Sequence, residues 1–318
     1  MTSDTVGEEL LVELDQTVLR GWKDTPQMCF AVSEKLYFRG RQSREARMAL
    51  LDTAEHFFAR HGHEVTHYFS ENSGNESPLA GKDAVERYRT ALGKGAFDDD
   101  DLHFCFFRKD ISAFDFGTIA KNRDRFPSTY RQAVRIQTLL EDTEGYIKRV
   151  IARCELLQPE QGTVSVNPHR PFGGIRGFHE HYWPFITRYP GLGVPYLVRK
   201  AAIARRVVQA NWLTVLDDEF ITALGGDTSL RALGEKGIVV HRYDGGVVLQ
   251  ASPLPDLGDL DAGRWPEGLG HVYRFIEPVQ VREVPRSPMS AMTVPEPLDP
   301  FEETLKWLTR FDRMPESI

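Results

Sequence analysis

Four histidines stand close together in the sequence and are the first residues whose type and spacing could do chemistry: His56, His61, His63 and His67. Imidazole is a common zinc ligand, so the cluster could serve a metal-dependent or hydrolytic enzyme. However, His61 should end a helix, where the helix dipole favours a cation, while His63 and His67 should lie on the strand that follows. No carboxylate or cysteine completes an evident ligand set. We therefore expect no bound metal and keep the enzyme as the alternative function.

Other catalytic patterns are missing from the sequence. The glycine-rich stretches at 173–177 and 191–193 match neither the dinucleotide fingerprint nor the P-loop. No G-x-S-x-G nucleophile elbow occurs. His103 and Cys105 are expected on opposite faces of a strand, which would separate them as a nucleophile pair. We expect no catalytic residues and no cofactor, which favours a binding role over an enzyme.

The composition is that of an ordinary globular protein with an acidic balance. The chain has 318 residues, of which 41% are hydrophobic and 27% charged, and its formal net charge is -7. This charge argues against nonspecific binding to nucleic acid or to an anionic membrane surface. Its three cysteines cannot all pair within the chain, which favours a reducing compartment. With an acidic N-terminal segment and no long apolar run, we expect a cytoplasmic protein.

The elements that must position these residues alternate between strands and helices. Up to residue 126 the predicted order is strand, helix, strand, helix, strand, strand, at 29–38, 43–62, 64–69, 82–92, 102–107 and 112–119. This order suits helices packed on one face of an antiparallel sheet.

The remaining sequence begins with helical patterns. We predict helices at 128–140, 147–157, 178–189 and 197–208, strands at 163–166 and 212–216, and a hairpin at 239–250. A proline-rich strap, 278–300, then leads into a last helix capped by Asp299. The expected fold is α+β, with two similar halves that each carry an antiparallel or mixed sheet with helices on one face. The predicted units are 1–126, 127–277, and 278–318 for the strap and docking helix.

Three segments carry a resemblance to a known family: R-Y-P-G-L at 188–192, N-W-L-T-V-L-D-D-E-F at 211–220, and V-V-H-R-Y-D-G-G-V-V-L-Q-A-S-P-L-P-D-L-G-D at 239–259. Through them the chain resembles the type VI immunity family. The resemblance implies a bacterial cytoplasmic protein that binds and neutralises an effector toxin of a type VI secretion system. Such proteins are typically encoded beside their toxin, and some of these toxins resemble nucleases. The shared positions look structural: Trp212 and Leu216 as core, Gly225 and Gly226 as a helix stop, and Asp244 and Gly245 as a turn.

An inhibitor of a nuclease should present acidic groups, because a nuclease must surround a phosphate backbone with basic ones. We therefore hypothesise that two acidic patches contact the toxin: Asp98, Asp99, Asp100 and Asp101, and secondly Asp256, Asp259 and Asp261. The alternative for the first patch is a solvated acidic loop without a partner. The sequence leaves the oligomeric state open.

Overall fold

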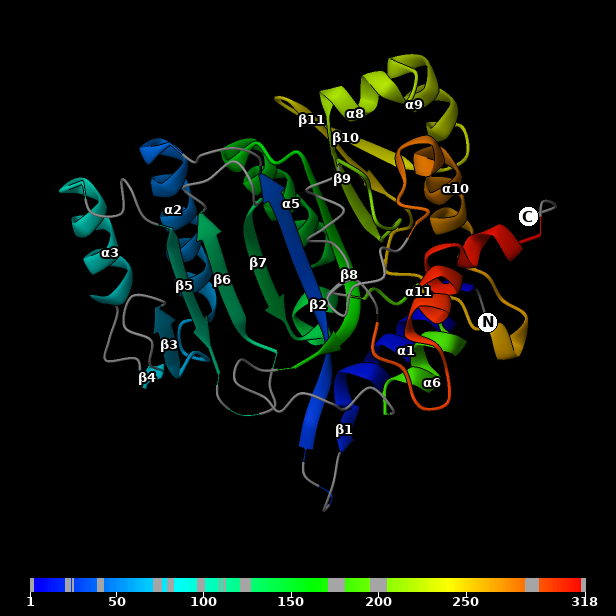
Figure 1. Ribbon diagram of the computed structural model, residues 1–318, viewed down its shortest axis with the longest axis horizontal. Coiled ribbons are helices and arrows are strands. Elements are labelled where there is room, and N and C mark those ends of the chain that lie inside the picture. Colours follow the sequence, from blue (N-terminus) through cyan, green and yellow to red (C-terminus); the bar gives the residue numbers. More distant parts are fainter. Residues whose placement is uncertain are drawn as a thin grey trace.

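A single antiparallel sheet organises the protein (Figure 1). The computed structural model describes residues 3–20, 24, 26–38, 43–70, 76–78, 83–95, 101–108, 110, 113–120, 127–170, 181–194, 205–283 and 292–315. In these ranges the sheet has eleven strands, in the order β10-β11-β9-β8-β2-β7-β6-β5-β3-β4, with β1 paired to β2. They are β1 (Val18–Arg20), β2 (Pro26–Phe38), β3 (His67–Ser70), β4 (Glu76–Pro78), β5 (Leu102–Phe107), β6 (Asp115–Ala120), β7 (Ser128–Val134), β8 (Gln161–His169), β9 (Leu213–Asp217), β10 (Val239–Tyr243) and β11 (Gly246–Gln250).

Helices pack around this sheet and give the molecule its α+β class. They are α1 (Ser3–Gln16), α2 (Arg44–His61), α3 (Asp83–Gly93), α4 (Ile136–Leu140), α5 (Thr143–Leu157), α6 (Trp183–Arg188), α8 (Asp218–Ala223), α9 (Gly226–Gly234), α10 (Glu267–Ile276) and α11 (Pro300–Leu308). α2 and α5 contact each other and lie behind the sheet in Figure 1. No helix in the described ranges is long and apolar enough to cross a membrane.

The central strand β2 shows how the two faces of the sheet differ. Successive side chains of a strand point to opposite faces. On one face Phe30, Val32 and Leu36 enter the main core, which also contains the apolar residues of α2 and α5. On the other face Ala31 belongs to a small cluster, and Ser33 donates its hydroxyl to Asn167 Oδ1 at 3.0 Å. The α2 and α5 helices therefore share the apolar face of β2.

Local capping follows the sequence closely. Ser43 accepts the Ala46 N–H at 3.2 Å and begins α2. Asp299 accepts the N–H groups of Phe301 and Glu302 at 2.8 and 2.9 Å and begins α11. A polar side chain before an apolar helical stripe satisfies N–H groups that the first turn leaves unpaired, so these starts are readable from sequence.

One predicted helix was wrong. The segment predicted as helix 128–140 is strand β7 followed by the short α4. β7 lies between β2 and β6 and hydrogen-bonds to both, so sheet pairing distant in sequence outweighs its helical pattern. Most of the segment predicted as helix 197–208, residues 197–204, lies outside the described ranges, so that helix stays a prediction. Only its end is described, where Val207 forms a parallel bridge to Gln280.

The sheet runs without interruption past residue 126. β7 follows that position in the chain, yet it lies between β2 and β6, which precede it. The division into units 1–126, 127–277 and 278–318 stays a prediction.

Candidate functional site

The predicted acidic residues differ in what they contact. Asp98, Asp99 and Asp100 lie outside the described ranges, and Asp101 is half-buried just before β5. Asp259 accepts hydrogen bonds from Arg188 Nε and Nη2 at 2.9 and 2.8 Å, and these bonds lower the pKa of its carboxyl.

Asp256 and Asp261, the other members of the second patch, differ in their contacts and in their exposure. Asp256 accepts the Gly258 N–H at 3.0 Å and lies 3.4 Å from Arg264 Nη1, while burial raises the pKa of its carboxyl. Asp261 lies 3.4 Å from Arg188 Nε, but its side chain is 73% exposed, against 14% for Asp259. Asp261 is therefore the most exposed carboxylate of this patch.

The inward-facing members of the patch help to join two family segments. Gly191 donates its N–H to Leu257 O at 2.9 Å. A Cβ at Gly191 would come within 2.4 Å of Asp256 O, so only glycine permits this approach. The R-Y-P-G-L segment and the P-D-L-G-D segment therefore pack backbone against backbone.

The remaining family positions lie in the scaffold. Trp212 is 2% exposed and donates its indole N–H to Ser252 O at 2.8 Å, and Leu216 is fully buried. Gly225 has a φ of 97° where α8 ends, and Gly226 has a φ of 66°. Asp244 and Gly245 form the two-residue turn between β10 and β11.

The histidine cluster is spread over separate environments. His61 ends α2, and its ring packs against those of Phe57 and Phe114 at centroid distances of 5.2 and 5.6 Å. Burial, aided by Arg60 nearby, lowers its pKa to about 4. His67 stacks on Phe107 at 5.8 Å.

The expected positions of His63 and of the His103–Cys105 pair were wrong. His63 lies in the turn after α2, because β3 begins only at His67. His103 and Cys105 are two residues apart on β5 and so share a face, with Nε2 and Sγ 3.5 Å apart. In the described ranges no group of three or more His, Cys, Asp or Glu side chains could hold a metal ion.

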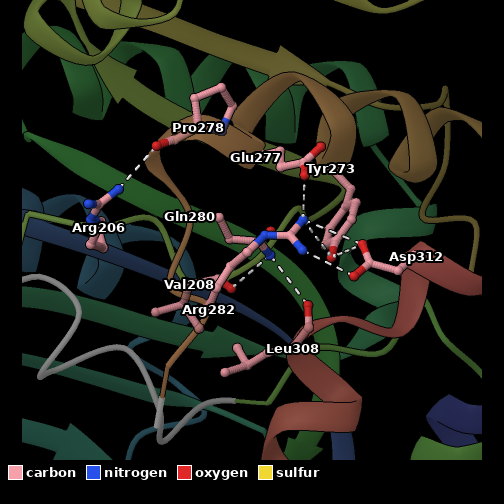
Figure 2. Close-up of polar contacts among 9 residues, drawn as sticks. All are labelled: Arg206, Val208, Tyr273, Glu277, Pro278, Gln280, Arg282, Leu308 and Asp312. Atoms are coloured by element: carbon pink, nitrogen blue, oxygen red, sulfur yellow. Dashed lines mark hydrogen bonds and ion pairs between the residues drawn. The ribbon is translucent and has the colours of Figure 1, made fainter. Parts of the chain in front are cut away.

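A polar network fixes the start of the strap (Figure 2). Arg282 pairs with Glu277 at 3.0 Å and with Asp312 at 3.1 Å, and Asp312 also accepts the Tyr273 hydroxyl at 2.7 Å. Gln280 donates its amide to Val208 O and Leu308 O, each at 3.4 Å. The strap is thereby attached to α10, α11 and the 205–210 segment.

A cleft of about 520 Å³ opens between α2 and α5. Its lining includes Arg60 and His56 from α2, Gln132 from β7, and Tyr146, Arg149 and Arg153 from α5. A volume of this size is in the range of small-ligand and side-chain pockets.

A buried ion pair lies beneath this cleft. Glu34 of β2 is fully buried, and its carboxylate accepts hydrogen bonds from Arg153 Nε at 2.9 Å and from Gln132 Nε2 at 3.2 Å. Gln132 in turn accepts the Tyr130 hydroxyl at 2.9 Å. Taking two charges out of water costs free energy, which these hydrogen bonds must offset. Loss of either partner alone would leave the other charge buried without compensation.

Two more arginines share one carboxylate at the edge of the cleft. Asp142 lies 2.9 Å from Arg149 Nη1 and 3.5 Å from Arg60 Nη2, and it also caps α5 through the Gly145 N–H. The pKa of Asp142 is lowered, chiefly by its hydrogen bond from Arg149.

Sequence reasoning missed this cleft. One signal was present: Glu34 has the same strand parity as Phe30, Val32 and Leu36, which places a carboxylate on the apolar face of β2. Such a residue needs a cationic partner. The partner's identity was not readable, because Arg153 lies 119 residues away.

Comparison with protein families decides what the chain is. The model of the family described as TsiV, Type VI immunity for VRR-NUC, matches residues 138–311, which is more than half of the chain. The chain belongs to this family. It is a type VI immunity protein, and binding to a cognate effector protein is the family's function.

A solved structure with the same fold also matches the chain. A Pseudomonas aeruginosa type VI secretion system protein, PA0821, superposes with a TM-score of 0.78 at 19% sequence identity, over 96% of this chain and 90% of that one. No curated protein matches the chain. The TsiV match begins in α4, so it includes α5 but not α2, and the cleft lies across its boundary.

Proposed function

We propose that this TsiV-family protein neutralises a nuclease effector by binding it stoichiometrically, without chemistry of its own. The observation that carries the proposal is the family match over residues 138–311, whose description couples type VI immunity to VRR-NUC. An inhibitor of this kind needs a complementary surface and tight burial, and it needs neither a cofactor nor a metal.

Charge supports the choice of a nuclease. A nuclease surrounds its substrate's phosphates with basic groups, and this chain carries a net charge of -7. Opposite potentials speed encounter between two proteins and disfavour wrong partners. We propose that Asp98 to Asp101 and the exposed Asp261, with Asp256 and Asp259 behind it, contribute to this contact.

The same proposal sets the place of action. A nuclease attacks nucleic acid inside the cell, so the immunity protein should act in the cytoplasm. We propose that it binds the effector there and binds neither nucleic acid nor membrane.

Co-expression tests the function directly. The effector encoded beside this gene should stop growth of a test bacterium, and this chain should restore growth, whereas a non-cognate effector should remain toxic. Effector toxicity that persists in the presence of the chain would contradict the proposal for that partner.

A titration separates binding from catalysis. If the chain binds stoichiometrically, nuclease activity should fall linearly and reach zero near one equivalent of immunity protein. An enzyme would instead protect at small fractions of an equivalent, which would revive the enzymatic alternative.

A further inference from the structure

The cleft between α2 and α5 has more positive than negative groups. Arg60, Arg149 and Arg153 line it, while the carboxylates that pair with them are Asp142 and Glu34. Arg60 and Arg149 share Asp142 between them. Each guanidinium has five N–H donors, and a single carboxylate shared by two arginines leaves most of these donors available. The cleft can therefore accept a further carboxylate.

Tyr146 adds a donor inside the cleft. Tyr146 is 2% exposed, and its hydroxyl has no partner at hydrogen-bond geometry among the residues that the structure describes, while the nearby Gln132 side chain opposes the rise of its pKa. The Arg149 guanidinium lies 5.8 Å from the centroid of its ring. Burial raises the pKa of this tyrosine, so the hydroxyl stays protonated and able to donate. A buried hydroxyl without a partner is costly, unless a ligand takes its hydrogen bond.

The cleft is also lined by exposed apolar side chains, which would add nothing to the binding of a small inorganic anion. Ala59 of α2 and Ala152 of α5 line the cleft and are exposed, and Leu156, also in the lining, is 41% exposed. Arginine and tyrosine beside exposed apolar surface are typical of residues that carry protein–protein binding energy. This combination favours a peptide segment over a free phosphate or a nucleotide.

We propose that the α2–α5 cleft receives an acidic segment of the effector, whose carboxylates meet Arg60 and Arg149 at the edge and the Tyr146 hydroxyl further in. Apolar side chains next to those carboxylates pack on Leu156 and the two alanines. This assignment rests on the proposed function, because it takes the effector as the occupant. The immunity protein would then bind the effector through a cationic cleft as well as through its proposed acidic patches.

The first test reverses the charge at the cleft edge. Arg60→Glu with Arg149→Glu should weaken binding of the purified cognate effector at least about a hundredfold in a calorimetric or surface-binding assay. The matched control is Arg87→Glu with Arg231→Glu, two exposed arginines on α3 and α9, which changes the net charge by the same amount. The control should change the Kd less than about threefold.

The second test avoids any change of charge or fold. Tyr146→Phe removes a hydroxyl that has no partner in the free protein, so the melting temperature should not fall. Binding to the effector should nevertheless weaken about tenfold, because a donor to a charged acceptor is lost. A tyrosine with a purely structural role would leave binding unchanged.

The outcomes separate this inference from the proposed function. If the wild-type chain does not bind the effector, the proposed function fails and the cleft assignment fails with it. If the wild type binds, and both the double reversal and Tyr146→Phe bind within threefold of it, only the cleft assignment is overturned. Weakening by the cleft variants alone, with the control unchanged, supports it.

Discussion

Arg310, in the short 3-10 helix that follows α11, donates its Nε hydrogen to the carbonyl oxygen of Pro190 at 2.6 Å. Its Nη1 donates to Trp307 O at 2.9 Å, and its guanidinium lies 4.0 Å from the centroid of the Trp307 ring. Arg310 is only 4% exposed, and burial lowers its pKa to about 9. This contact fastens the end of the chain to the R-Y-P-G-L segment, 120 residues earlier.

Arg310→Met should lower the free energy of unfolding by about 2–3 kcal/mol. Methionine can fill much of the volume, but Pro190 O then loses its donor in a buried site. Urea denaturation measures the change. Arg313→Met, at an exposed position of the same short helix, is the control and should stay within about 0.5 kcal/mol. Equal stability of the two variants would show that the Pro190 contact contributes nothing.

Asp259→Asn and Asp261→Asn remove the same charge but should act on different properties. Asp259→Asn weakens the paired hydrogen bonds from Arg188 and should destabilise the fold by about 1–2 kcal/mol. Asp261→Asn should leave stability nearly unchanged and slow association with the effector, because its carboxylate is exposed. Thermal melts and stopped-flow binding distinguish them. An unchanged association rate for Asp261→Asn would remove this residue from the proposed contact.

Local chemistry made some of the fold readable from sequence. The cap at Ser43 and the hairpin turn at Asp244 and Gly245 depend on neighbouring residues alone, so pattern was enough. β7 was misassigned because its strand state depends on β2 and β6, whose pairing no local pattern encodes.

The candidate site was harder to predict for the same reason. Arg60 and Arg149 occupy different helices, and each appears in the sequence as an ordinary surface charge. They form one site only because α2 and α5 pack together, which brings both arginines to the carboxylate of Asp142. Conversely, the acidity of Asp259 was readable from sequence, but its pairing with Arg188 was not.

Glu34→Leu should destabilise the protein more than the double change Glu34→Leu with Arg153→Met. The single variant leaves the Arg153 guanidinium buried without its carboxylate, which costs about 3–5 kcal/mol. The double variant removes both charges from the core, so much of this cost should disappear. Urea denaturation of the wild type, both single variants and the double variant forms a complete cycle. Additive effects would contradict a strong coupling between Glu34 and Arg153.

The stability of the fold should fall as the pH drops from 6.5 towards 4, and His61 should cause part of that fall. Its pKa is lowered from 6.5 to about 4 by burial and by the positive groups around it, chiefly Arg60 and then Arg149, His63 and Arg153. Between these values the unfolded chain binds a proton that the folded chain does not, so the unfolding free energy decreases as the pH falls. Above pH 6.5 the contribution is fully present.

His61→Gln removes this titration and should flatten the pH dependence between pH 7 and pH 5, measured as urea midpoints. Some slope should remain, because burial also lowers the pKa of His169 to about 4. His63→Gln is the matched control, since that side chain is 74% exposed. A slope in His61→Gln equal to that of the wild type would show that His61 is protonated in the folded protein, and the cleft would then carry a further positive charge at pH 5.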